Sequence, residues 1–246
     1  MSRSERRREA QGKGGSDMSK IYMILGAVAV IGVGVIGYSV GSGSTAAAMA
    51  PVVIEGLDED MERLAEMAQG VTKGDENAAV TIIEFGDYQC PGCGMFAQQV
   101  KPQVELLLVE AGKAKFVFYD FPITNIHPNA FLAARAARCA DDQDRFWDYH
   151  DNLFRNQARW SALANAAGLF EEYARTLEMD DGAFEACLNS DRHADLVTAN
   201  MMLGEVLGVP STPTILIEFE GDARQVEPDF LSIQSYVNEL LEPASE

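Results

Sequence analysis

The chain has 246 residues, of which 47% are hydrophobic and 9% aromatic, and this composition excludes an intrinsically disordered protein. Its formal net charge of −19 at pH 7 repels phosphate backbones, so we expect no nucleic-acid partner.

The charge is unevenly distributed along the chain. Residues 1–20 carry six Lys or Arg and three Asp or Glu, which leaves 13 bases and 35 acids for the remainder. Residues 21–40 contain no charged side chain, and 20 helical residues span about 30 Å, the thickness of a bilayer's hydrocarbon core. We therefore expect a single-pass anchor at 21–40, a cytoplasmic tail at 1–20 and a periplasmic or otherwise extracytoplasmic remainder. A cleavable signal peptide is the alternative, because residues 46–50 (AAAMA) offer small residues for cleavage.

The next elements follow from composition and periodicity. Residues 41–70 are a small-residue linker followed by a short amphipathic helix over 57–68. The β-branched run at 80–85 (VTIIEF) predicts a buried strand, and 115–121 (KFVFYDF) predicts a second one. Between them we expect a helix from 91 to about 111 that Pro102 interrupts.

A long helical block separates these elements from the last strands. Residues 127–207 have helical periodicity throughout and are too many for a simple connection, so they predict an inserted helical subdomain. Strands are expected at 214–219 and around 224–227, and a closing helix at 229–241. The expected fold is α/β, with a βαβ half at 71–126 and a ββα half at 208–246 on either side of the insertion.

A cysteine pair, Cys90-Pro91-Gly92-Cys93, directly follows the predicted strand and opens the predicted helix. Pro91 at the first helical position makes Cys90 the N-cap, where free N–H groups and the helix dipole favour a thiolate. Such a thiolate is the nucleophile of disulfide exchange, and Cys93 is placed to resolve a mixed disulfide. A structural disulfide and half of a zinc site are the alternatives, although no second CxxC or HxxxH pattern supplies further ligands. We expect redox chemistry, with no metal and no cofactor.

The segment FGDYQCPGCGMF, the motif Ser211-Thr212-Pro213-Thr214 and the order of elements resemble the DsbA family. They are most similar to its membrane-anchored, thioredoxin-like branch in bacteria, over roughly residues 71–241. The resemblance implies a thioredoxin fold and a thiol–disulfide oxidoreductase that introduces disulfides into unfolded exported proteins. It also implies reoxidation by a quinone-linked membrane partner of the DsbB or vitamin-K-epoxide-reductase (VKOR) type.

The resemblance also assigns roles to the second motif. In the family its proline is cis and packs against the active-site disulfide, and Pro213 matches that position. A cis proline would present the backbone of Thr212 as an edge to which an extended client could add as a strand. An ordinary trans turn is the alternative. The best-known oxidase of the family has Pro-His between its cysteines, whereas this chain has Pro-Gly, which implies a less oxidising pair.

Glu84 lies in the middle of the first predicted strand, six residues before Cys90. A buried carboxylate is costly, so it needs a partner or a task, and the resemblance implies proton transfer at the buried thiol. An exposed charge at a strand edge is the alternative, and Lys115 is our candidate for a partner. His127 is expected to cap or hinge the entrance of the helical block.

The two remaining cysteines, Cys139 and Cys187, fall in two predicted helices of the insertion. Cysteines of an exported domain more often pair than stay free, and related proteins resemble this one in having a second, structural disulfide there. Two reduced core thiols are the alternative.

Three other functions remain open at this stage. The same chemistry could run as a disulfide isomerase or reductase. Cys90 and Cys93 could instead hold soft Cu(I) in a metal carrier. A chaperone-like binding module would not need its cysteines at all.

Overall fold

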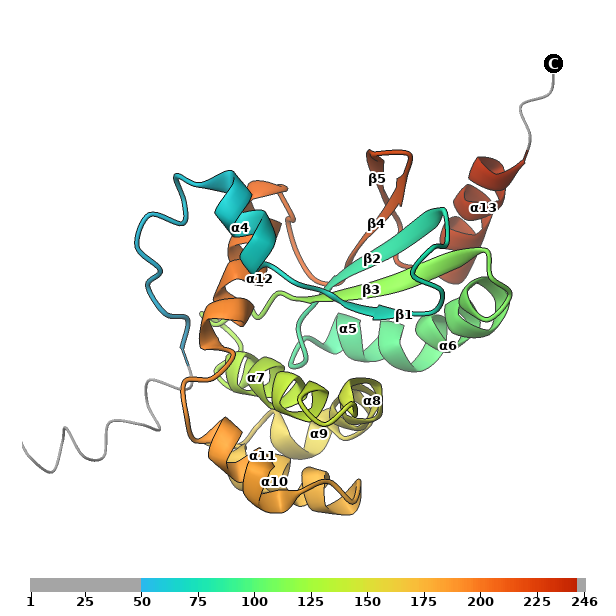
Figure 1. Cartoon of the computed structure of the whole chain (residues 1–246). Coiled ribbons are helices and arrows are strands. Elements are labelled where there is room, and N and C mark those ends of the chain that lie inside the picture. The colour runs from blue at the N-terminus through green and yellow to red at the C-terminus, as the bar shows by residue number, and fades with distance from the viewer. Residues whose placement is uncertain (1–49, 243–246) are drawn as a thin grey trace, which may run out of the picture. The chain divides into compact units, whose positions relative to one another are not determined.

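A five-stranded mixed sheet organises the computed structural model, which describes residues 50–242 (Figure 1). Its order is β1-β3-β2-β4-β5; β2 and β3 run parallel, and the other neighbours are antiparallel. The strands are β1 (Val71–Lys73), β2 (Val80–Gly86), β3 (Ala114–Asp120), β4 (Thr214–Phe219) and β5 (Asp222–Val226). The predicted α/β fold with a helical insertion is confirmed.

The predicted tail at 1–20 and anchor at 21–40 lie outside the described residues. Within residues 50–242, no helix is both long enough and apolar enough to cross a bilayer.

Strand β2 is the centre of the sheet and carries the cysteine pair at its end. It lies between β3 and β4, and all its residues except Ile83 are buried. A strand covered on both faces needs a nearly continuous apolar sequence, which VTIIEF supplies. Glu84 is the exception in this run, and it stands in register with Phe118 on β3 and Ile215 on β4. Its carboxyl group therefore lies inside the protein, and the alternative of an exposed strand edge is wrong.

The helix that follows Cys90 and contains Cys93 runs from Pro91 to Val109 in four consecutive segments. These are α5 (Pro91–Met95), the π-helical η1 (Phe96–Val100), α6 (Lys101–Val104) and the π-helical η2 (Glu105–Val109). Pro102 has no N–H to donate, and the first wide turn closes just before it, where Lys101 N–H donates to the Phe96 carbonyl. The irregularity expected at Pro102 is thus present as a change of helix type, and it accompanies the burial of Lys101.

Six helices form the predicted insertion, and Figure 1 shows α7 to α11 gathered into one group below the sheet in that view. The six are α7 (Ala130–Asp141), α8 (Phe146–Arg155), α9 (Gln157–Trp160), α10 (Ala167–Thr176), α11 (Asp181–Leu188) and α12 (Ala194–Val206). The small side chains of α7 (AFLAARAARCAD) allow close approach, and α7 contacts α8, α10, α11 and α12. The closing helix, α13 (Phe230–Leu241), packs on α6 and β4.

Two short elements differ from the sequence-based expectations. The amphipathic helix is α4 (Met61–Met67), so it starts later than predicted, and Leu57 is buried ahead of it. Strand β1 was not predicted, because three residues show no periodicity. Leu57 and Leu64 belong to a small core shared with Ala199 of α12, which attaches this N-terminal segment to the insertion.

Candidate active site

Cys90 is the N-cap of α5 and is partly exposed, as the sequence predicts for the attacking cysteine. Its backbone is extended (φ −69°, ψ 123°), and Pro91 occupies the first helical position. As a thiol, Cys90 makes no capping hydrogen bond; its Sγ donates instead to the Thr212 carbonyl at 3.3 Å. The nucleophile therefore lies between the start of the helix and the Pro213 loop.

The pKa of the Cys90 thiol is lowered from 9.0 to about 5. Hydrogen bonding from Cys93 is the largest cause, and the Thr212 side chain and the backbone N–H groups of Cys93 and Gly92 act in the same direction. Partial burial opposes them. Because donors surround the sulfur, Cys90 is a thiolate at neutral pH, which is the reactive form.

Cys93 has the opposite character. Its side chain is fully buried, and burial raises the pKa of its thiol well above the usual value, with Cys90 and the charge of Glu84 adding to the rise. The backbone N–H of Asp87 donates to Cys93 Sγ at 3.4 Å and favours the thiolate. One exposed sulfur with a low pKa and one buried sulfur with a high pKa form an attacking and a resolving pair.

Glu84 is fully buried and interacts electrostatically with both cysteines, and neither of its carboxyl oxygens has a hydrogen-bond partner among the described residues. Burial raises its pKa from 4.5 to about 8, and the positive charge of Lys101 lowers it in part. The prediction that Lys115 pairs with Glu84 is wrong, because Lys115 extends outward and donates to the Glu76 carbonyl. A carboxyl group with a pKa near neutrality suits proton exchange with a buried thiol.

Lys101 is the cation that the sequence did not reveal. It is 1% exposed, and its Nζ contacts Glu105 Oε1 at 2.6 Å and Asp151 Oδ1 at 2.9 Å. Asp151 in turn contacts His150 Nδ1 at 2.9 Å. The signal was a lysine at regular helical spacing from Ala97 and Val104 on the apolar face of this helix, where a lysine is rarely buried unless it is paired.

The Thr212–Pro213 peptide is cis, and the Pro213 loop lies against the cysteine pair. An ideal Cβ at Gly92 would lie 3.2 Å from Pro213 Cδ and 3.6 Å from Cys90 Sγ, which shows how closely the two segments approach. Beside them opens a hollow of about 190 Å³, lined by Met95, Phe96 and Pro228 among others. Met95 is 61% exposed, so the hollow has an apolar, accessible rim.

The loop before Cys90 is held by side chains from the helical insertion. The Asp87 carboxylate is fully buried and contacts His127 Nδ1 at 2.7 Å. Gln157 Nε2 donates to the carbonyls of Tyr88, at 2.7 Å, and of Cys90, at 2.9 Å. The roles of Asp87 and Gln157 were not predicted from the sequence, and His127 was expected at the entrance of the insertion without this contact. The cap of α7 is Asn129.

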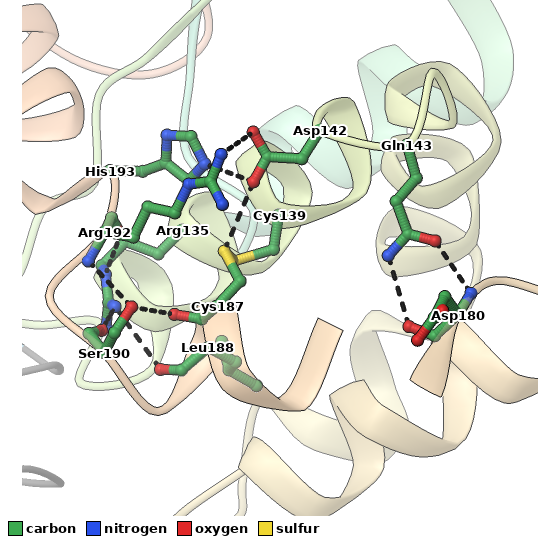
Figure 2. The surroundings of a disulfide bond; sticks show 10 residues. All are labelled: Arg135, Cys139, Asp142, Gln143, Asp180, Cys187, Leu188, Ser190, Arg192 and His193. Atoms are coloured by element: carbon green, nitrogen blue, oxygen red, sulfur yellow. Dashed lines mark hydrogen bonds and ion pairs between the residues drawn. A yellow bond between two sulfur atoms is a disulfide. The ribbon is translucent and has the colours of Figure 1, made fainter. Parts of the chain in front are cut away.

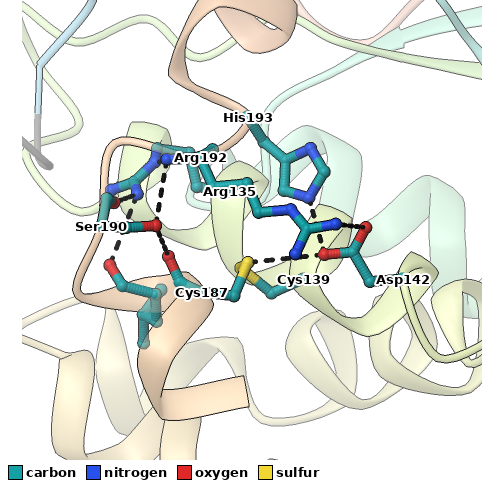
Figure 3. Close-up of polar contacts among 8 residues, drawn as sticks. Arg135, Cys139, Asp142, Cys187, Ser190, Arg192 and His193 are labelled. Atoms are coloured by element: carbon teal, nitrogen blue, oxygen red, sulfur yellow. Dashed lines mark hydrogen bonds and ion pairs between the residues drawn. A yellow bond between two sulfur atoms is a disulfide. The ribbon is translucent and has the colours of Figure 1, made fainter. Parts of the chain in front are cut away.

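Cys139 and Cys187 form a disulfide, and Figure 2 shows it joining α7 to α11. Both cysteines are buried, whereas Cys90 is partly exposed. Asp142 lies beside it and contacts Arg192 at 3.1 Å and His193 at 3.0 Å (Figure 3). The expected pairing within the insertion is present, and its position fits a link that holds the insertion together.

Comparison with known proteins finds the same thioredoxin-like fold over most of the chain. A family profile described as thioredoxin matches residues 66–233. Disulfide bond formation protein D of Bacillus subtilis is 28% identical over 145 residues, which cover 58% of this chain and 65% of that protein. Na⁺/H⁺ antiporter NhaA 1 of Salinispora arenicola is 34% identical over 145 residues. That match covers 59% of this chain but 21% of the antiporter, so the chain spans about a fifth of its length.

Solved structures with the same fold cover most of the described residues. Oxidised BdbD from Bacillus subtilis superposes with a TM-score of 0.61 at 25% identity, covering 72% of this chain and 97% of that one. Alpha-DsbA1 from Wolbachia pipientis superposes with a TM-score of 0.61 at 20% identity, covering 70% and 90%, and shows the fold alone. Because the thioredoxin profile matches more than half of the chain, the chain belongs to the thioredoxin family.

Proposed function

We propose that this chain introduces disulfides into exported proteins by thiol–disulfide exchange at Cys90 and Cys93. The observation that carries the proposal is the asymmetry of the pair. Cys90 is partly exposed and has a pKa lowered to about 5, whereas Cys93 is buried and has a raised pKa. The disulfide bond formation protein among its relatives supports the same activity.

The reaction starts from the Cys90–Cys93 disulfide. A client thiolate attacks Cys90 Sγ, a mixed disulfide forms, and Cys93 leaves and takes up a proton. Protonated Glu84 is the nearby donor, because its pKa of about 8 keeps it neutral at pH 7. A second client thiolate then attacks the client sulfur of the mixed disulfide, and Cys90 leaves as a stable thiolate. Two electrons pass from the client dithiol to the cysteine pair.

The low pKa of Cys90 favours this direction of electron flow. At pH 7 a pKa of about 5 instead of 9.0 stabilises the reduced form roughly a hundredfold, which corresponds to about 60 mV of added oxidising power. Gly92 contributes no side chain to this stabilisation. Cys93, Thr212 and the backbone N–H groups supply it instead, so a histidine between the cysteines is not required.

The client binds beside Cys90. An extended segment adds to the backbone at Thr212 as a strand, and its apolar side chain enters the hollow lined by Met95, Phe96 and Pro213. This arrangement places a client cysteine next to the exposed sulfur and leaves client sequence otherwise unrestricted.

The cellular setting is part of the proposal. Residues 21–40 anchor the chain in the cell membrane, with residues 1–20 cytoplasmic and the redox domain on the extracytoplasmic side. A quinone-linked membrane oxidoreductase of the DsbB or VKOR type reoxidises the Cys90–Cys93 pair. The uncharged span and its basic flank support the anchor, and the requirement of an oxidase for a fresh disulfide after each turnover supports the partner.

The proposal is tested by equilibrating the purified full-length protein with glutathione buffers and measuring the reduction potential of the cysteine pair. A potential of about −120 to −180 mV, in the range of known oxidants and isomerases, supports disulfide donation. A potential of about −270 mV, as in thioredoxin, makes the chain a reductase instead. A metal held by Cys90 and Cys93 without disulfide formation would exclude both.

A further inference from the structure

We propose that His127 is a positioning residue that tunes the redox equilibrium of the cysteine pair through Asp87. Its ring holds the Asp87 carboxylate, and the backbone of the same aspartate contacts both cysteines. The inference rests on the proposed exchange at Cys90 and Cys93 and names a residue that regulates it.

Asp87 connects the two cysteines through its backbone. Its N–H donates to Cys93 Sγ at 3.4 Å, and its carbonyl accepts from the Cys90 N–H at 3.1 Å. The N–H contact favours negative charge on Cys93. The position of the Asp87 peptide groups therefore influences the sulfur that leaves when a client attacks.

The Asp87 side chain fixes this position, because it is fully buried and accepts three hydrogen bonds. Oδ1 accepts from the Gln89 N–H at 2.7 Å. Oδ2 accepts from the Ile123 N–H at 2.8 Å and from His127 Nδ1 at 2.7 Å. A carboxylate can only accept, so Nδ1 is the protonated ring nitrogen in this pair. Gln89 and Ile123 donate from their backbones, whereas His127 donates from a side chain that substitution can remove.

The contact also links two parts of the fold. Asp87 follows β2, and His127 lies in the segment between β3 and α7 that enters the helical insertion. Gln89 binds the same region, since its Oε1 accepts from the Asn129 N–H at 2.8 Å and its Nε2 donates to the Ser161 carbonyl at 2.7 Å. His127 is 15% exposed, so it closes this buried network at its outer edge.

Removing the His127 donor should make the pair less oxidising. A buried carboxylate that loses a donor pulls the loop toward other partners or water. The Asp87 carbonyl, which accepts from the Cys90 N–H, then moves, and Cys90 shifts relative to the groups that stabilise its thiolate. The reduced form loses stability as a result, because Cys90 is its thiolate at pH 7 whereas the raised pKa of Cys93 keeps that sulfur protonated. We expect the equilibrium constant with glutathione to fall about fivefold to tenfold, or roughly 20–30 mV toward more negative potential.

The test measures the glutathione equilibrium of four full-length variants beside the wild type. His127→Leu and His127→Ser remove the donor, and the milder serine change keeps the test valid if the leucine variant does not fold. His127→Asn places an amide N–H where Nδ1 was. His193→Leu is the control, because His193 makes the same kind of pair with Asp142, at 3.0 Å, beside the second disulfide (Figure 3).

The inference predicts a shift of at least fivefold for His127→Ser or His127→Leu, with the Asn variant and the His193 control within twofold of wild type. In an Asp87→Asn background the same His127 change should have a smaller effect, because the charged acceptor is gone. Folded His127→Ser or His127→Leu protein with a wild-type equilibrium overturns the inference and leaves the proposed function intact. A wild-type pair that never exchanges with glutathione overturns both.

Discussion

Replacing Glu84 by glutamine should stabilise the folded protein at alkaline pH. The change keeps the size and shape of the side chain but removes its charge. In the folded state burial raises the Glu84 pKa from 4.5 to about 8, so the native protein holds this proton more tightly than the unfolded chain does. Stability therefore falls as pH rises from about 4.5 to about 8, and it stays low above that range.

The size of the effect follows from the two pKa values. Between pH 5 and pH 9 the titration of Glu84 should cost the wild type about 4 kcal/mol of unfolding free energy, at 1.36 kcal/mol per pKa unit. Glu84→Gln carries no such cost. The two proteins should have similar stability near pH 5, and the variant should be more stable by a few kcal/mol at pH 9.

Denaturant unfolding of the oxidised full-length protein at several pH values measures the difference. Both disulfides stay intact without reductant, and burial, the main cause of the shift, persists in this form. Glu66→Gln, at an exposed helix position, is the control and should follow the wild type at every pH. A stability difference between wild type and Glu84→Gln that does not change with pH would refute the reasoning, because Glu84 would then titrate as in the unfolded chain.

Three further predictions concern the cysteines. Iodoacetamide should alkylate Cys90 of the reduced protein with a midpoint near pH 5, whereas a midpoint near pH 8 or 9 would contradict the thiolate stabilisation. Thr212→Val should move that midpoint upward, because the threonine side chain helps to lower the pKa; an unchanged midpoint would assign the effect to the other donors. Replacing Cys139 and Cys187 by alanine should lower the unfolding free energy by about 4 kcal/mol, from the entropy of a loop of 48 residues, and leave the Cys90–Cys93 potential unchanged. Denaturant unfolding measures the loss of unfolding free energy, and a loss below about 1 kcal/mol would contradict the prediction. Glutathione equilibration measures the Cys90–Cys93 potential.

The elements that the sequence predicted well are those with strong local signals. The β-branched run at 80–85 and the proline after Cys90 specify a buried strand and a helix start within a dozen residues. Local chemistry also pointed to Cys90 as the nucleophile. The buried position of Glu84 followed because a charge inside an apolar run is rarely accidental.

The contacts that regulate the site were not predictable in the same way. Asp87 and His127 are 40 residues apart, and only the packing of the insertion against the sheet brings them together. Lys101 keeps the regular spacing of the buried face of its helix, but its pairing with Asp151 of α8, 50 residues away, depends on how the helices pack. Long-range pairs depend on tertiary geometry, and a local sequence pattern does not contain it.

The most direct test of disulfide donation is a single-turnover reaction with a client. Oxidised full-length protein is mixed with a reduced peptide that contains two cysteines, and the products are separated after acid quenching. We predict one peptide disulfide formed for each Cys90–Cys93 disulfide lost. A Cys93→Ser variant, first activated at Cys90 with glutathione, should hold a mixed disulfide at Cys90 when it meets a peptide with a single cysteine, because no second thiol is present to release it. A peptide that stays reduced while the Cys90–Cys93 disulfide persists would contradict it.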